Sequence, residues 1–184
     1  NLKDQLVWSP SRNVEIAGRV GYFFRQTTRT VEQPERYRDF SGGLRIDWTL
    51  SDHDMLQANY AFDQYDKSDY QKLRKLDIRD YSNVRNTFRL LYNHTFGSGD
   101  ILTAGADFMH DYLFNTNLDN SERKQDSFDF FMQYDWRISQ KLEAVGAVRY
   151  DYFSDGGESR LTPKLNLCYK PVRNLSLRAG YGMG

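Results

Sequence analysis

The chain is built from stretches in which every second residue is apolar. Residues 101–114 and 128–137 show the pattern most clearly. A period of two places successive side chains on opposite faces of a β-strand. One face of each stretch is uniformly apolar and rich in aromatic residues, and the other carries enough charge to line water. In the second stretch the apolar set is Phe128, Phe130, Met132, Tyr134 and Trp136.

The pattern recurs in about ten stretches along the sequence, and the connections between them are alternately short and long. Outer-membrane barrels have short periplasmic turns and longer extracellular loops. We therefore predict an all-β fold, an antiparallel transmembrane β-barrel with about ten up-and-down strands. The short connections are 9–13, 51–54, 97–100, 139–141 and 170–174, and the long ones are 27–37, 66–76, 115–124 and 154–160.

The overall composition does not decide between a soluble protein and a barrel. Hydrophobic residues make up 39% of the chain, and the mean hydropathy is −0.76. No run approaches the length of apolar sequence that a membrane helix needs, but a barrel strand needs only about 9–11 residues, half of them apolar. The 13 tyrosines suit the boundary between hydrocarbon and water, where a ring with a polar edge is favoured.

Charge and residue types exclude several other functions. The 25 basic and 25 acidic residues are interspersed, so nothing favours a nucleic-acid partner. Cys168 is the single cysteine, which excludes an internal disulfide or a zinc cluster. His53, His94 and His110 fall on separate elements, and no catalytic motif appears. We therefore predict no metal, no cofactor and no enzymatic activity.

The order of turns and loops places both ends of the chain at the extracellular rim. Complete outer-membrane barrels are expected to begin and end on the periplasmic side. Ten strands with open edges would also leave backbone groups unpaired in hydrocarbon, at several kcal/mol each. We therefore expect residues 1–184 to be a partial transmembrane β-barrel domain, with a plug domain and the remaining strands absent. The N-terminus shows no signal-peptide layout, which fits removal of that segment or an interior piece.

The last two stretches resemble a pair of strands in TonB-dependent outer-membrane receptors. They read LTPKLNLCYKP over residues 161–171 and LSLRAGYGMG over residues 175–184. The resemblance implies a barrel of about 22 strands with a plugged lumen. It also implies import of a scarce ligand of the siderophore, haem or cobalamin type across the bacterial outer membrane. The implied partners are the plug domain and remaining strands of the parent chain, the TonB complex acting through the plug, the small-molecule ligand and the lipid membrane.

Aromatic residues near the long connections are the candidate ligand-binding residues. Tyr37 and Tyr70 are expected within loops, and Tyr65 and Phe153 next to them, where each can stack on a flat ligand at the extracellular mouth. The competing interpretation is an aromatic girdle facing lipid. The girdle is favoured for residues that share the apolar face, which are Tyr112, Phe114 and Tyr152.

Charges on the opposite face are expected to form salt bridges with neighbouring strands or with the plug. They are Arg85, Arg89, Asp135, Arg137, Arg149 and Asp151. Carboxylates in the long loops lack the spacing of a calcium site and are expected to be solvated.

Two other readings of the sequence remain open. The first is a standalone ten-strand outer-membrane barrel, which could be a surface protease; its only hint is the neighbouring pair His110 and Asp111. The second is a soluble propeller or sandwich, which the polar second face fits poorly. A dry centre in which Phe130, Trp136 and Leu167 pack together would overturn the barrel prediction.

Overall fold

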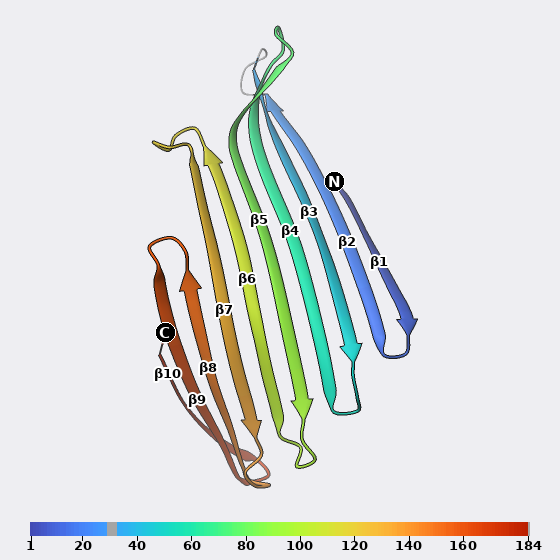
Figure 1. The fold of residues 1–184 in the computed structure, drawn as a ribbon, viewed down its shortest axis with the longest axis vertical. Helices are drawn as coiled ribbons and strands as arrows, with labels where there is room; N and C mark the ends of the chain where they lie inside the picture. The colour runs from blue at the N-terminus through green and yellow to red at the C-terminus, as the bar shows by residue number, and fades with distance from the viewer. Residues whose placement is uncertain (29–32, 184) are drawn as a thin grey trace. The chain divides into compact units, whose positions relative to one another are not determined.

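The computed structural model describes residues 1–28 and 33–183. These residues form one antiparallel sheet of ten strands in chain order, so each strand pairs with its sequence neighbours (Figure 1). The predicted all-β, up-and-down architecture is confirmed. β1 and β10 form the two edges, and the sheet is open. The strands are β1 (Leu2–Ser11), β2 (Val14–Thr28), β3 (Pro34–Thr49), β4 (Asp54–Gln71), β5 (Leu76–Thr95), β6 (Ile101–Asn115), β7 (Glu122–Trp136), β8 (Leu142–Phe153), β9 (Glu158–Val172) and β10 (Leu175–Gly182).

The described part of the chain contains no helix with the length and apolarity needed to cross a bilayer.

Contacts divide the sheet into two compact units, which are described separately. Unit 1 comprises residues 1–46, 59–88 and 109–126, and unit 2 comprises residues 47–58, 89–108 and 127–184. Unit 1 therefore holds β1 and β2 together with the ends of β3 to β7 that adjoin the predicted long connections. Unit 2 holds the turns at 50–53 and 96–100 and nearly all of β7 to β10.

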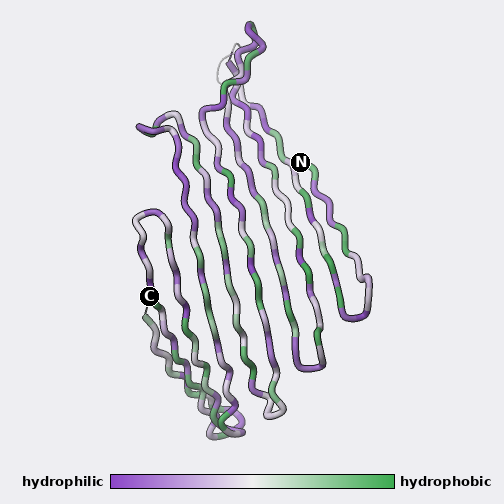
Figure 2. The backbone as a smooth tube through the Cα atoms, in the orientation of Figure 1, coloured by the Kyte–Doolittle hydropathy of each residue, from purple (hydrophilic) through white to green (hydrophobic). Residues whose placement is uncertain are grey.

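Strand register in unit 2 separates apolar from polar residues face by face. Phe130 of β7 lies opposite Tyr150 of β8, which lies opposite Leu161 of β9. On the other face, Asp129 lies opposite Asp151. Figure 2 shows the resulting alternation of hydrophobic and hydrophilic residues along the strands. We call these two sides of each strand the apolar face and the polar face.

The apolar face is exposed rather than packed into a core. Phe130 is 57% exposed, Trp136 is 51% exposed and Leu167 is 40% exposed. Among the described residues, Ala144 and Pro34 are the buried apolar residues. Soluble proteins seldom expose a continuous apolar surface of this kind. Unit 2 therefore lacks the dry centre that would have overturned the barrel prediction.

Unit 1 shows the same exposed apolar face in its own strands. In the β1–β2 pair, Leu6 lies opposite Gly18 and Trp8 lies opposite Ile16. Leu6 is 73% exposed and Trp8 is 59% exposed.

The predicted turn at 9–13 is too long, because β1 continues through Pro10 to Ser11 with a register shift between Trp8 and Ser11. Proline is tolerated there because a bulge or an edge strand requires no N–H at that position.

The predicted long loops are also too long, because their flanking strands continue as hairpins. β3 begins at Pro34, so Tyr37 lies in a strand, and β4 runs to Gln71, so Tyr70 does as well. Residues 29–32 of the predicted 27–37 loop lie outside the described residues. The remaining connections shorten to 72–75, 116–121 and 154–157. Where both faces of a hairpin meet water, the sequence stops alternating while backbone pairing continues.

Glycines fix the tight turns where the backbone must turn back on itself. Gly99 has a φ of +86°, within the turn predicted at 97–100. Gly156 and Gly157 have φ values of +80° and +64° in the connection between β8 and β9. Glycine reaches such angles without the steric penalty of a Cβ atom.

Candidate functional site

A row of three tyrosines crosses neighbouring strands in unit 1. The ring centroids of Tyr37 on β3 and Tyr65 on β4 are 6.5 Å apart. Tyr81 on β5 meets Tyr65 edge-on, with centroids 5.9 Å apart and an angle of 70° between the rings. Side chains in register on one face of a sheet meet in this way. The row forms a continuous aromatic surface that can stack on a flat ligand.

Ion pairs flank the tyrosine row. Lys67 lies between two carboxylates, with its Nζ 3.4 Å from Glu35 and 3.3 Å from Asp80. The Tyr37 hydroxyl donates a hydrogen bond of 2.8 Å to Glu35. These contacts hold β3, β4 and β5 together where the alternating apolar pattern has ended. They also fix the ring of Tyr37 in place, which lowers the entropic cost of binding a ligand.

The cations of β3 that alternate with Tyr37 make a second cluster. Arg36 and Arg38 both bind Asp77, the former at 3.2 Å, and Arg38 also donates to Ser68 at 3.0 Å. The Arg36 guanidinium lies 3.4 Å from the centre of the Tyr70 ring. Strand alternation puts Tyr70 on the other face from Tyr65. Arg36 therefore occupies a face of the Tyr70 ring that a ligand would need.

Two of the four candidate binding residues thus come together, namely Tyr37 and Tyr65. Phe153 ends β8 in unit 2, opposite Ser127 and Glu158. Tyr81 was missed because the sequence pattern placed it at the margin of a long loop. The sequence did hold a sign that Tyr81 lies beside Tyr65. The two residues are separated from the turn at 72–75 by nearly equal numbers of residues, as cross-strand partners in a hairpin are.

The charges of the polar face bind mainly to neighbouring strands. Arg89 makes two hydrogen bonds to Asp107, of 2.6 and 2.8 Å. Arg149 on β8 contacts Asp129 on β7 at 3.0 Å, and it also contacts Asp151 of its own strand at 2.5 Å. In unit 1, Arg85 lies 3.0 Å from Asp111. Salt bridges between guanidinium and carboxylate groups of this kind link adjacent strands. The sequence predicted such salt bridges for these arginines.

Each of two histidines has its own acidic partner. His94 Nδ1 lies 2.7 Å from Asp54, and His110 Nδ1 lies 2.6 Å from Asp126. Asp111 instead accepts hydrogen bonds from Asn83 and Arg85, so the neighbouring pair that hinted at a protease does not interact as a dyad. Within residues 1–28 and 33–183, no group of His, Cys, Asp and Glu side chains is arranged to hold a metal ion.

A cluster at the turn that ends β5 links this turn to β7. The Asp100 carboxylate accepts hydrogen bonds from the Ser98 hydroxyl and the Arg137 backbone N–H, both at 2.7 Å, and from the Tyr134 hydroxyl at 3.2 Å. These donors, Ser98 foremost, lower the pKa of Asp100 below its ordinary value. The turn is thereby tied to the next hairpin.

The chain matches solved structures of similar fold at low sequence identity. The siderophore receptor PirA from Pseudomonas aeruginosa is 14% identical, with a TM-score of 0.79 over 98% of this chain and 32% of that one. PirA from Acinetobacter baumannii is 12% identical, with a TM-score of 0.72 and the same two coverages. The chain thus spans about a third of the length of these receptors. Likeness at such identity shows the fold alone.

The sequence itself assigns the family. No curated protein sequence matches the chain significantly. The family profile described as "TonB dependent receptor-like, beta-barrel" matches residues 3–184, which is nearly the whole chain. This match extends the resemblance seen over residues 161–184. The chain belongs to the TonB-dependent receptor β-barrel family.

Proposed function

We propose that residues 1–184 are a stretch of the outer-membrane barrel of a receptor that imports a siderophore-type ferric chelate. The family match supports the assignment of the chain to a receptor barrel. The exposed apolar face of the sheet supports the placement of that face against membrane lipid. Receptors of this family are transporters rather than enzymes, in agreement with the prediction of no enzymatic activity. We carry the siderophore-type ligand over from the two PirA receptors, which share this fold.

The remaining strands and the plug domain belong, in this proposal, to other parts of the parent chain. The chain matches only 32% of each PirA structure, and β1 and β10 each have one strand neighbour. Backbone groups along such edges cannot stay unpaired in hydrocarbon. An open sheet gives no support to a self-contained ten-strand barrel, and a single sheet without a core gives none to a propeller or a sandwich. TonB would supply energy by acting on the plug.

The tyrosine row at Tyr37, Tyr65 and Tyr81 is the part of this chain that we assign to ligand contact. It offers adjacent rings, two contacts between them and a neighbouring lysine. Tyr70, although a candidate on sequence grounds, is a weaker one because Arg36 covers its ring. Phe153, which does not belong to the tyrosine row, stays a predicted ligand-binding residue.

Binding to the purified full-length receptor tests the proposal. The probes are catecholate and hydroxamate ferric siderophores, haem and cobalamin, followed by quenching of intrinsic fluorescence. One siderophore class is expected to bind, and radioactive iron from it to enter cells only when TonB is present. Binding of haem or cobalamin alone would contradict the ligand class.

A matched pair of variants tests the tyrosine row. Tyr65→Ala removes the central ring and both ring contacts, so the affinity for the siderophore is expected to fall by about 1–2 kcal/mol, or roughly 5- to 30-fold. Tyr152→Ala is the control, because Tyr152 lies opposite Phe128 on the apolar face. Equal affinities of the two variants for the siderophore would show that the tyrosine row is not part of the binding site.

A further inference from the structure

The connection between β4 and β5 carries the densest group of positive charge in the sequence. Residues 72–75 read Lys-Leu-Arg-Lys, and all four are exposed, Leu73 by 87%. Figure 1 shows this hairpin extending beyond the end of β2 in the same unit. Among the described residues, no ion pair or side-chain hydrogen bond involves Lys72, Arg74 or Lys75. Their charges are therefore open to a partner from outside the sheet.

The other charges of this hairpin do not cancel those of its tip. Lys67 already occupies Glu35 and Asp80, and Asp77 binds two arginines of β3. Residues 66–81 and their ion-pair partners on β3 together hold seven cations and five carboxylates, which leaves two positive charges in excess. The cations are Arg36, Arg38, Lys67, Lys72, Arg74, Lys75 and Arg79, and the carboxylates are Glu35, Asp66, Asp69, Asp77 and Asp80.

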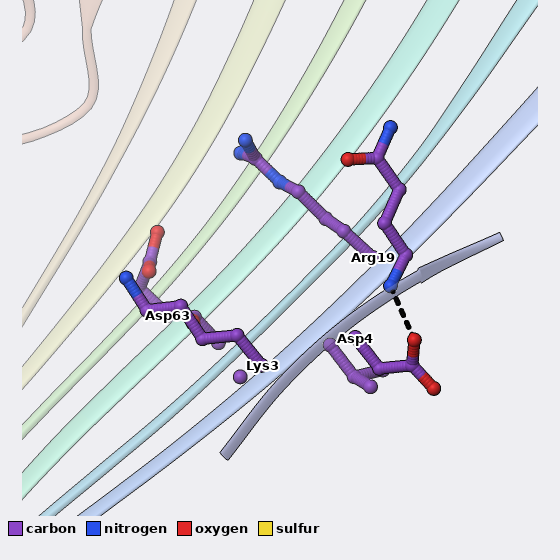
Figure 3. A pocket seen from close by; sticks show the side chains of 8 residues that line it. Lys3, Asp4, Arg19 and Asp63 are labelled. Carbon is purple, nitrogen blue, oxygen red and sulfur yellow. Dashed lines mark hydrogen bonds between the residues drawn. The ribbon is translucent and has the colours of Figure 1, made fainter. Parts of the chain in front are cut away.

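A polar groove elsewhere in unit 1 shows no such excess. The groove, of about 500 Å³, lies over β1 to β4, and two cations and two carboxylates line it (Figure 3). They are Lys3 and Arg19 against Asp4 and Asp63. The excess thus belongs to the hairpin of β4 and β5, which also carries Tyr65 and Tyr81 of the tyrosine row.

We propose that the ligand of the tyrosine row is an anionic ferric chelate of the catecholate type, and that the tip at 72–75 attracts it. This inference rests on the proposed function and narrows its ligand class. A ferric tris-catecholate is an anion, because its six deprotonated oxygens carry more negative charge than the ferric ion offsets. Its arms are flat aromatic rings that can stack on tyrosine. A ferric tris-hydroxamate is neutral, and its chelating groups are not aromatic.

The distance between the tip and the row determines how the tip acts. Six residues separate Tyr65 from the end of β4 at Gln71, which is roughly 20 Å along an extended strand. Charges act over about 30 Å at an ionic strength of 0.01 M but over only about 8 Å at physiological salt. The tip therefore speeds the arrival of an anion more than it holds the bound ligand, and the effect should be largest at low salt.

Two synthetic chelates on one tripodal scaffold test the ligand class. One has three catecholate arms and the other has three hydroxamate arms, and each is loaded with ferric iron. Binding to the purified full-length receptor is followed by quenching of intrinsic fluorescence. The catecholate chelate is expected to bind at least about tenfold more tightly. Equal affinities, or tighter binding of the hydroxamate chelate, would overturn the inference.

A pair of double variants tests the role of the tip. Lys72→Gln with Arg74→Gln should lower the association rate constant of the catecholate chelate about tenfold at an ionic strength of about 0.01 M. The rate constant of the hydroxamate chelate should stay the same. Lys141→Gln with Arg173→Gln, in two of the predicted short turns, removes the same charge and should change neither rate constant. Stopped-flow fluorescence measures the rates, and heat-modifiability on gels checks folding. Equal rate constants of the two folded double variants for the catecholate chelate would overturn the attraction by the tip.

The two chelates also separate this inference from the function beneath it. Binding and TonB-dependent uptake of the hydroxamate chelate alone would overturn the catecholate class and leave siderophore import standing. Failure of both chelates and of natural ferric siderophores to bind the folded receptor would overturn the proposed function itself.

Discussion

Replacing Met132 with arginine tests which side of β7 faces lipid. The apolar set of this strand runs from Phe128, 42% exposed, to Trp136, 51% exposed, with Met132 at its centre. Eight steps of about 3.4 Å span about 27 Å along the strand. A tilt of about 40° reduces this to about 21 Å along the membrane normal, close to the apolar band of about 25 Å in outer-membrane barrels. In the proposed barrel wall, Met132 therefore lies near the midplane.

The expected cost follows from that depth. An arginine facing lipid at the midplane destabilises a barrel by about 2–4 kcal/mol. This corresponds to a roughly 30- to 900-fold change in the folding equilibrium. Gln133→Arg, one residue along, is the matched control. Gln133 donates a hydrogen bond of 2.8 Å to Asp135 on the polar face, and an arginine can donate to the same carboxylate. Its cost should stay within about 0.5 kcal/mol.

The assay is guanidinium unfolding of the full-length receptor folded into phospholipid vesicles, with a gel shift on heating as the measure of folding. The midpoint should fall clearly for Met132→Arg and hardly for Gln133→Arg. If Gln133→Arg is destabilised as much as or more than Met132→Arg, the assignment of faces on β7 is wrong.

Two further predictions concern packing and pH. Gly105→Ala should destabilise the receptor by about 1–3 kcal/mol, because the new Cβ would meet the Phe131 ring and lie 2.9 Å from the carbonyl oxygen of Leu90. Gly146→Ala, with no atom within 4 Å of its Cβ, should be tolerated, and equal midpoints of the two variants would refute this packing argument. The pKa of Asp100 is lowered in the folded state, so its stabilising contribution is present above about pH 4, the ordinary pKa of aspartate, and is lost as the pH falls further. Asp100→Asn should therefore show a smaller loss of stability between pH 5 and pH 3 than the unmodified receptor, measured as unfolding midpoints, and an equal or larger loss would contradict the role of this carboxylate.

The strands and their two faces could be predicted from the sequence because a strand with one apolar and one polar face alternates strictly along the chain. Phe130 and Trp136 were expected to share one face of their strand, and both are exposed on the apolar face of β7. The turn at Gly99 was also predictable, since few residues other than glycine adopt its positive φ. The segment 161–184 added a family resemblance that the family profile extends to residues 3–184.

The outer ends of the hairpins could not be predicted in the same way. Polar residues lie on both faces of these strand ends, so the part of β5 that carries Tyr81 shows no alternation and its sequence resembles a loop. Contacts such as Arg36 over Tyr70 depend on which positions face each other across strands, and the period of a single strand does not fix this. The place of Arg19 over Gly43 depends on the same register.

The direction in which the alternating face points is measured most directly by labelling consecutive residues of β7. Single cysteines at positions 128 to 136, in the full-length receptor with Cys168→Ser, carry an environment-sensitive fluorophore in vesicles that contain brominated lipid. Even-numbered positions should be quenched by the lipid and odd-numbered positions by aqueous iodide. Quenching that does not alternate, or that alternates in the opposite sense, would contradict a barrel wall with its apolar face in lipid.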